Sequence, residues 1–322
     1  MGKIIKMFKI SELVYKSKDA LSVSGIGVYS LRDTLECGQC FRHELIEDSD
    51  GYLEYITVIK EKIVRVGQRA PGELIFFDTK EEEIRGFVGE YFSLYTDYEA
   101  LREDILSRTE SDWLRRAAEA GGGIGILKQD EWETLFSFII SQNNNIPRIR
   151  KIIRQLCAEY GVNLCLQNGI SVCPLSKIDG TPCDEKCKSC GICYSFPKPE
   201  DIVKNPEKML PSRPGFRYKY LLDAAVSVCD GSIDLAAIKE RKSYEYTLEQ
   251  LKKIKGVGDK VASCVALFGF NNLEAFPVDV WMKRAIDKYF DGNLDPLTLG
   301  KYAGIAQQYI FHYIRNINED NG

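Results

Sequence analysis

The stretch LKKIKGVGDKVASCVALFGFNNLEAFPVDVWM (residues 251–282) decides the fold of the second half of the chain. Its pattern predicts two helices joined by a tight hairpin, followed by a loop and the start of another helix. In the hairpin, Gly256 and Gly258 bracket Val257, and glycine tolerates positive φ and a close approach of another backbone. The hairpin amides and the start of the following helix therefore predict an anion site.

Two candidate catalytic side chains, an amine and a carboxylate, flank this predicted anion site. Lys260 falls in the first turn of the second helix, and Asp279 follows Pro277 at a position where it can cap the next helix. An amine and a carboxylate at helix starts, beside a site for a phosphate, indicate chemistry on a nucleic acid.

Length and composition are those of an ordinary globular enzyme. The 322 residues suffice for two or three domains, with 44% hydrophobic and 28% charged residues. No apolar run approaches the ~20 residues of a membrane span, and the basic N-terminus lacks the pattern of a signal peptide. We therefore expect a cytoplasmic protein, associated with the nucleoid if it is bacterial, that has no membrane partner.

The net charge alone does not indicate a DNA-binding protein. It is −4, whereas proteins that bind DNA through many phosphates are often basic. The positive residues are clustered, however, and binding depends on local patches. One cluster comprises Lys252, Lys253, Lys255 and Lys260, and the other Arg148, Arg150, Lys151 and Arg154. The alternative is that these charges are scattered over a solvated surface.

The N-terminal part predicts an antiparallel sheet. Four segments alternate apolar and polar residues and are separated by turn residues: ALSVSGIGVYSL, CFRHELIED, YLEYITVIKEKIVRVG and ELIFFDTK. Gly38 stands where a strand should begin, as a bulge or as a place where a ligand touches the backbone. From about residue 82 the period is helical. We expect an α+β protein, with an antiparallel β domain and flanking helices at 1–110 and a helical domain at 111–322 whose hairpin motif lies at about 245–270.

Two further segments combine polar or aromatic residues with arginines. Asp130 is expected to cap a helix that leads into Asn143, Asn144 and Asn145, and Pro147 suits the first turn of the next helix. Phe216 follows a glycine and precedes Arg217. An exposed aromatic among cations suits a wedge that stacks on bases, and the alternative is a core aromatic at a helix start.

Residues 163–197 break the helical pattern and are interpreted as an inserted loop. The ligand type and number for a tetrahedral zinc site are provided by Cys183, Cys187, Cys190 and Cys193, for which Cys165 or Cys173 can substitute. A reducing compartment favours metal binding over disulfides for such a cluster. A structural zinc ion is therefore expected, and the alternative is a reduced, cysteine-rich surface loop.

The landmarks along the chain resemble those of the 8-oxoguanine DNA glycosylases, which are helix–hairpin–helix, Gly/Pro-Asp base-excision enzymes. In order, they are GQCFR at 38–42, FSFI at 136–139, NNNIPR at 143–148, GFR at 215–217, GVGDKVASC at 256–264, PVDV at 277–280 and YAGIAQ at 302–307 with Phe311. The resemblance covers nearly the whole chain, apart from the cysteine-rich insertion. It implies a TATA-binding-protein-like antiparallel sheet domain followed by an all-helical domain that holds the cleft.

The resemblance also implies an activity, a partner and residue roles. The protein would be a DNA N-glycosylase and abasic-site lyase, a monomer that excises 8-oxoguanine opposite cytosine from duplex DNA without a catalytic cofactor. Lys260 would form the Schiff base, and Asp279 would stabilise positive charge on the sugar. The damaged base would be recognised by Gly38, Cys264, Gln307 and Phe311, with the Gly38 carbonyl accepting the N7–H that normal guanine lacks, Gln307 reading the Watson–Crick edge, and Cys264 and Phe311 sandwiching the ring. The DNA contacts would come from Asn143, Asn144, Asn145, Arg148, Phe216, Arg217, Gly256, Val257, Gly258 and Trp281, of which Phe216 replaces a common tyrosine and Trp281 a common histidine.

Two alternatives remain at this point. A glycosylase for alkylated purines shares the fold and the aspartate but typically lacks the equivalents of Lys260 and of the strand around Gly38. A non-catalytic helix–hairpin–helix DNA-binding module needs the hairpin and its basic surroundings, but neither Lys260 nor Asp279.

Overall fold

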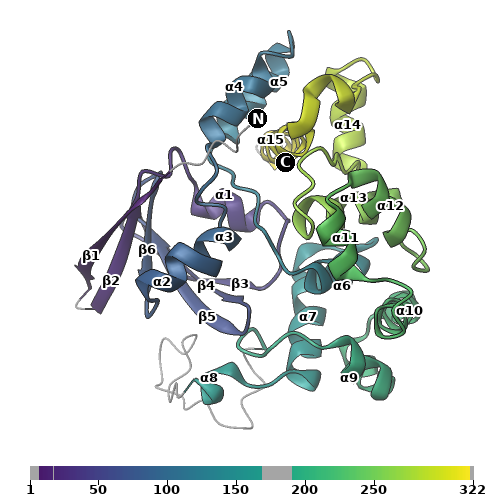
Figure 1. The fold of residues 1–322 in the computed structure, drawn as a ribbon. Coiled ribbons are helices and arrows are strands. Elements are labelled where there is room, and N and C mark those ends of the chain that lie inside the picture. Colours follow the sequence, from purple (N-terminus) through teal and green to yellow (C-terminus); the bar gives the residue numbers. More distant parts are fainter. Residues whose placement is uncertain (1–6, 17, 169–190, 320–322) are drawn as a thin grey trace.

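A computed structural model describes residues 7–16, 18–168 and 191–319 of the chain. A six-stranded sheet lies on one side of the molecule and most of the helices on the other (Figure 1). The expected α+β fold, with an antiparallel sheet domain followed by a helical domain, is confirmed.

The sheet is antiparallel throughout. Its strands are β1 (Lys9–Tyr15), β2 (Lys18–Ser24), β3 (His43–Ser49), β4 (Tyr52–Ile59), β5 (Lys62–Gln68) and β6 (Glu73–Phe77), in the spatial order β1-β2-β6-β5-β4-β3. Two-residue turns join β3 to β4 and β4 to β5, at Asp50-Gly51 and Lys60-Glu61. All four turn residues have positive φ, which matches the twist of the flanking strands.

The prediction for this region is wrong in two details. First, the short helix α1 (Leu31–Glu36) forms between two predicted strand segments and was not predicted; Ser30 caps it by accepting a hydrogen bond from the Asp33 N–H at 3.2 Å. Gly38 therefore lies in a turn after a helix and not at the beginning of a strand. Second, β1 was not predicted, because it is an edge strand with little burial and hence a weak alternation of apolar residues.

The helical part follows the sheet in sequence. Its first elements are α2 (Glu81–Glu83), η1 (Ile84–Val88), α3 (Gly89–Tyr91), α4 (Tyr98–Leu106), α5 (Asp112–Ala120), α6 (Glu131–Ser141), α7 (Ile146–Tyr160) and α8 (Leu164–Gln167). The later ones are α9 (Pro199–Lys204), η2 (Pro206–Ser212), η3 (Gly215–Arg217), α10 (Tyr218–Cys229), α11 (Leu235–Arg241), α12 (Tyr244–Leu251), α13 (Asp259–Phe268), α14 (Val280–Tyr289), η4 (Pro296–Tyr302) and α15 (Ala303–Glu319). Among the described residues, no helix is long and apolar enough to cross a membrane.

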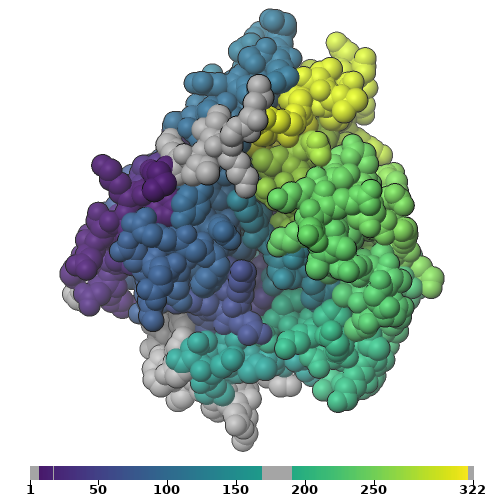
Figure 2. Space-filling model, viewed as in Figure 1, coloured from purple at the N-terminus to yellow at the C-terminus, as the bar shows by residue number. Residues whose placement is uncertain are grey.

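The interior has one large core among the helices and a second beneath the sheet. The helical core includes Leu135, Phe136 and Ile310, while Tyr55 and Phe76 belong to the core between the sheet and α1 to α3. Helix α15 packs against α5 and α14 (Figure 1). In the space-filling view, blue residues of the N-terminal half lie directly beside green and yellow residues of the C-terminal half (Figure 2). The exact domain boundary at residue 110 stays a prediction.

Candidate active site

The predicted helix–hairpin–helix is present. Helices α12 and α13 flank the turn, and Gly256 has a φ of +81°. A Cβ atom at this position would lie 2.5 Å from the ring of Tyr220, so that the close approach requires glycine. Val257 is buried, while Gly258 is the exposed N-cap of α13. The hairpin thus places Lys260 in the first turn of α13.

The Lys260 amine and the Asp279 carboxylate line one small cavity. Asp279 is the N-cap of α14, as predicted, and its Oδ1 accepts a hydrogen bond from the Met282 N–H at 2.9 Å. Its other oxygen accepts no hydrogen bond from the described residues. The Nζ atom of Lys260 lies 5.3 Å from the ring centroid of Phe138. The capping bond therefore holds the carboxylate at the same cavity as the amine.

This inner cavity also brings together all four residues predicted to recognise the base. It is lined by Cys37, Gly38, Phe138, Lys260, Cys264, Phe268, Pro277, Asp279, Gln307, Gln308 and Phe311. Its volume is about 50 Å³. Because a water molecule occupies roughly 30 Å³ in the liquid, a flipped base enters only if lining side chains move.

The thiols of the inner cavity are poor nucleophiles. Burial raises the pKa of Cys264, an effect that Lys260 opposes and Asp279 reinforces. Burial likewise raises the pKa of Cys37 to about 12. Both groups are protonated at neutral pH, so that neither thiol competes with the Lys260 amine as a nucleophile.

Gly38 presents its backbone to the inner cavity. Its φ is +86°, and a Cβ atom there would lie 3.9 Å from both Ile146 and Phe311. Its carbonyl accepts no hydrogen bond from the described residues. The adjacent Gln39 is fully buried, and its amide bonds to the backbone at Thr34, Gly125 and Leu127. These bonds hold the turn in which Gly38 lies.

An open hollow of about 710 Å³ adjoins the inner cavity and is called the outer groove. It shares Gly38, Phe138, Lys260, Asp279 and Phe311 with the inner cavity and is also lined by Phe41, Ser141, Gln142, Asn143, Asn144, Asn145, Ile146, Pro147, Ile149, Val280, Trp281 and Arg315. The predicted DNA-contacting residues Asn143, Asn144, Asn145 and Trp281 thus lie beside the catalytic pair. Trp281 is half-buried, with the Arg284 guanidinium 5.1 Å from its ring centroid.

The three asparagines build the junction between α6 and α7. The Asn145 side chain caps α7 by accepting from the Arg148 N–H at 3.0 Å, and the Asn144 amide donates to the Ile140 carbonyl at 3.0 Å. Asn143 is exposed, with a φ of +47°. Two of the amides therefore serve the turn itself, while the Asn143 side chain makes no hydrogen bond within the described residues.

The predicted DNA-contacting residues Arg148, Phe216 and Arg217 do not line the inner cavity or the outer groove. The hairpin residues 256–258 do not line them either. Arg217 is buried and donates to the carbonyls of Pro214, Gln142 and Asn143, the last at 2.8 Å. It thereby ties η3 to the α6–α7 junction. Phe216 is 50% exposed, and Arg148 is exposed as well. Phe216 is thus not a core aromatic, and Arg217 places it beside the rim of the outer groove.

Five residues of the inner cavity were not predicted to act: Cys37, Phe138, Phe268, Pro277 and Gln308. Phe138 and Phe268 stack with ring centroids 5.6 Å apart. Phe138 belongs to the FSFI landmark at 136–139, which was a usable signal. Gln308 carried no signal, because a second glutamine on a helix is an ordinary polar residue in a sequence.

Three of the four predicted zinc ligands, Cys183, Cys187 and Cys190, lie outside the described residues. Cys193 is described and is buried with Cys165 in a small cluster against β4. The Leu164 N–H donates to the Cys193 carbonyl at 2.9 Å, and Asn163 pairs with Tyr194. The two ends of the cysteine-rich segment therefore meet at Cys165 and Cys193.

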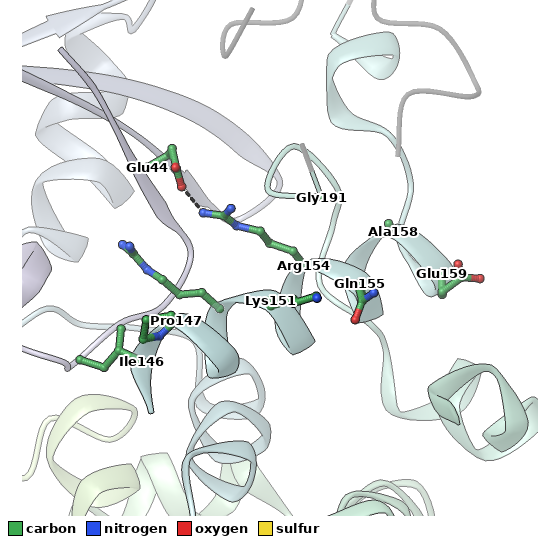
Figure 3. A pocket seen from close by; sticks show the side chains of 10 residues that line it. Glu44, Ile146, Pro147, Lys151, Arg154, Gln155, Ala158, Glu159 and Gly191 are labelled. Atoms are coloured by element: carbon green, nitrogen blue, oxygen red, sulfur yellow. Dashed lines mark hydrogen bonds and ion pairs between the residues drawn. The ribbon is translucent and has the colours of Figure 1, made fainter. Parts of the chain in front are cut away.

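The charge clusters seen in the sequence are partly neutralised by ion pairs. Lys252 pairs with Asp259 at 2.7 Å and Lys255 with Asp223 at 2.9 Å. A groove of about 700 Å³ lies beside α7, and Lys151 and Gln155 of this helix line it. In this groove, Glu44 of β3 and Arg154 of α7 point toward each other and form an ion pair (Figure 3). Of the described residues, only Ile146 and Pro147 line both this groove and the outer groove.

Known proteins share these features. The family model described as 8-oxoguanine DNA glycosylase, N-terminal domain, matches residues 25–135. The N-glycosylase/DNA lyase of Saccharomyces cerevisiae is 27% identical over 273 residues, which are 79% of this chain and 66% of the yeast protein.

Two solved structures cover almost the whole chain. The 8-oxoguanine glycosylase/lyase of Clostridium acetobutylicum, in complex with double-stranded DNA containing cytosine opposite 8-oxoguanine, is 31% identical with a TM-score of 0.78, over 98% of this chain and 99% of that one. MBOgg1 in complex with a low-affinity DNA ligand is 34% identical with a TM-score of 0.78, over 97% and 99%.

The chain has a helix–hairpin–helix that places a lysine and a capping aspartate at one cavity, and its similarity to N-glycosylase/DNA lyases and glycosylase/lyases shows a DNA glycosylase with lyase activity. The structural matches extend over nearly the full length of the chain. The chain therefore belongs to the 8-oxoguanine DNA glycosylase family.

Proposed function

We propose that the protein removes 8-oxoguanine from duplex DNA, opposite cytosine, and then cleaves the strand at the abasic site. The observation that carries this proposal is the inner cavity, where the Lys260 amine, the Asp279 carboxylate and the backbone of Gly38 meet. A cavity of this kind serves an enzyme that extrudes a base from the helix before acting on it.

We assign recognition of the damaged base to the Gly38 carbonyl, which accepts no hydrogen bond from the described residues. Oxidation at C8 gives the base an N7–H donor, and the Gly38 carbonyl accepts it. Normal guanine has an acceptor at N7, so that two acceptors would face each other without a hydrogen bond. A buried polar group left unpaired costs about 1–3 kcal/mol, which separates the two bases. The half-exposed Phe216 acts as the wedge that fills the space left by the extruded nucleotide.

The chemical steps need one amine and one carboxylate. The Nζ atom of neutral Lys260 bonds to C1′ as the bond from C1′ to the base breaks, and the base leaves with the bonding electrons and takes up a proton. The sugar ring opens as O4′ takes a proton from the attached amine, which leaves a protonated imine. Loss of a proton from C2′ then expels the 3′ phosphate. Asp279 stabilises the positive charge that develops on the sugar.

The two alternatives fit the site less well. An alkylated-purine glycosylase has no need of an amine at the cavity or of a backbone acceptor for N7–H. A non-catalytic DNA-binding module has no need of a lysine and a carboxylate on the same cavity wall.

Borohydride trapping tests the proposal. Duplexes carrying 8-oxoguanine opposite each of the four normal bases are incubated with the protein and borohydride, which reduces an imine to a stable adduct. We expect an adduct, most abundant opposite cytosine, that is lost in Lys260→Gln. The matched control is Lys253→Gln, an exposed lysine of the hairpin that donates to Gln250 and lies outside the cavity. Wild-type protein that gives neither adduct nor base release would overturn the proposal.

The proposal extends to partner, assembly and location. The protein binds double-stranded DNA as a monomer, without a catalytic cofactor, in the cytoplasm, and it is associated with the nucleoid if the organism is a bacterium. Light scattering of the complex with a short duplex checks the assembly, since a monomer gives one chain for each lesion. Cell fractionation checks the location.

We also propose that the cysteine-rich insertion binds a structural zinc ion through Cys183, Cys187, Cys190 and Cys193. The meeting of Cys165 and Cys193 at the base of this segment supports it, because buried thiol groups near each other suit a metal. Metal analysis of the purified protein tests it. We expect one zinc ion per chain, and absence of metal with reactive thiols at these positions would refute the proposal.

A further inference from the structure

Helix α15 carries two adjacent glutamines that both line the inner cavity, Gln307 and Gln308. Each is only 4% exposed, which is unusual for a side chain with two amide donors and a carbonyl acceptor. The reading of the Watson–Crick edge by Gln307 follows from the family, whereas nothing in the sequence assigns a role to Gln308.

A hydrogen bond sets the orientation of the Gln307 amide. The Gln308 Nε2 donates to the Gln307 Oε1 at 2.6 Å. Among the described residues, Gln307 makes no other side-chain hydrogen bond. The terminal torsion of a glutamine has a broad, roughly two-fold preference, so that its oxygen and nitrogen can exchange places at little steric cost. With the Gln308 amide in the orientation seen here, its bond favours the orientation in which the Gln307 oxygen faces Gln308.

The orientation of an amide decides which purine edge it matches. The edge of a guanine presents the acceptor O6 beside the donor N1–H, whereas that of an adenine presents the donor N6–H beside the acceptor N1. One orientation of the Gln307 amide pairs with the first pattern and the opposite orientation with the second. The N7–H contact at Gly38 is the same for 8-oxoguanine and 8-oxoadenine, so that this contact alone does not separate them.

Gln308 has a side-chain acceptor that is free to bind a ligand. The Gln308 Oε1 is buried and has no hydrogen-bond partner among the described residues. A buried acceptor without a partner is costly, which favours a ligand that brings a donor. Guanine carries such a donor in its 2-amino group, and adenine has none at that position.

We propose that Gln308 is a specificity-determining residue that orients the Gln307 amide and accepts a hydrogen bond from the 2-amino group of the extruded base. The pair of glutamines then selects 8-oxoguanine over 8-oxoadenine. This inference rests on the proposed function, because it concerns the choice of base in the same cavity.

Single-turnover excision from duplexes carrying 8-oxoguanine, 8-oxoadenine or 8-oxohypoxanthine opposite cytosine tests the proposal. In wild-type protein, we expect 8-oxohypoxanthine, which lacks the 2-amino group, to be excised about 10-fold more slowly than 8-oxoguanine, the scale of one hydrogen bond. In Gln308→Met, which keeps the volume but not the amide, we expect the ratio of 8-oxoguanine to 8-oxoadenine rates to fall about 10-fold. The gap between 8-oxoguanine and 8-oxohypoxanthine should also narrow.

The outcomes separate this inference from the function on which it rests. If Gln308→Met lowered the excision rate by the same factor on all three bases, Gln308 would only support the fold. This result would overturn the inference. Equal wild-type rates on 8-oxoguanine and 8-oxohypoxanthine would also overturn it, without use of any variant. A wild-type protein that excises none of the three bases would instead refute the proposed function.

Discussion

The inner cavity and the outer groove share one wall but differ in burial. The inner cavity has about 50 Å³ and is lined by buried side chains such as Cys264, Gln307 and Phe268, whereas the outer groove has about 710 Å³ and is flanked by the exposed Asn143. Because the side chains that line the inner cavity are more buried, a polar contact there has a larger effect on the free energy than one in the outer groove. We infer that base choice and chemistry depend on the inner cavity, and that DNA binding depends on the groove and its rim.

The largest effect is expected from a substitution that removes charge from the inner cavity but keeps the fold. Asp279→Asn retains an acceptor for the Met282 N–H, and asparagine is as good an N-cap as aspartate, so that the stability should change little. The excision rate should fall about 10²–10³-fold, since the carboxylate no longer stabilises charge on the sugar. Single-turnover kinetics measure this rate.

Asp234→Asn is the matched control for that prediction. Asp234 caps α11 in the same way, accepting from the Ala237 N–H at 2.9 Å, on the exposed surface. This variant should excise at the wild-type rate. If Asp279→Asn also retained the wild-type rate, the role assigned to the carboxylate would be wrong.

The next effect is expected at the rim of the outer groove. Phe216→Ala removes a half-exposed ring and should leave the stability within about 0.5 kcal/mol of wild type. The affinity for the lesion duplex should fall about 10-fold or more, because stacking on a base contributes about 1–3 kcal/mol. Leu210→Ala, another exposed apolar residue, serves as the control in fluorescence-anisotropy titrations. Equal affinities of the two variants would exclude a wedge at Phe216.

A smaller effect is expected from backbone strain at the shared wall. Gly38→Ala forces a side chain onto a residue with a φ of +86° and should destabilise the fold by about 1–2 kcal/mol. Gly51→Ala has the same kind of strain, at a φ of +74°, and its Cβ atom would meet nothing within 4 Å. Thermal unfolding should show similar losses, while only Gly38→Ala should slow excision of 8-oxoguanine. If both variants excised 8-oxoguanine more slowly, the slower excision would result from backbone strain and not from the position of Gly38 at the cavity.

The smallest effect concerns the pH dependence of stability, away from both hollows. Burial, together with Arg150 and Arg154, lowers the pKa of His43 well below its usual 6.5. Below pH 6.5 the unfolded chain therefore binds a proton that the folded chain does not, and the stability falls with pH by at most about 1.4 kcal/mol per unit. Urea unfolding between pH 7.5 and 5.5 should give a smaller loss for His43→Gln. Identical pH slopes would contradict this prediction.

Local features of the site were predictable from the sequence. The caps at Asp130 and Asp279, Pro147 in the first turn of α7 and the hairpin glycine Gly256 all occur as expected. Each depends on residues a few positions apart, whose hydrogen bonds and backbone angles follow from local chemistry. The helix α1 was missed because it is only six residues long and lies between two segments that were predicted to be strands, although Ser30 provided a cap.

Features that depend on distant residues were not predictable from local patterns. Lys255 lies in a basic run, but the residue that neutralises it is Asp223, far away in sequence. Gly38 and Phe311 meet at the inner cavity only through the tertiary fold, and the family resemblance, not their local sequence, indicated them. The bond from Gln308 to Gln307 has no signature in the sequence, because its importance arises from burial.

Peptide mapping of the borohydride-trapped adduct tests the central claim most directly, since the claim is that the amine at the inner cavity attacks the sugar. The adduct formed on a duplex with 8-oxoguanine is digested with protease and nuclease, and the modified peptide is sequenced by mass spectrometry. The account predicts that the sugar remnant is attached to Lys260. A remnant attached to Lys253, to another lysine or to the N-terminal amine would contradict it.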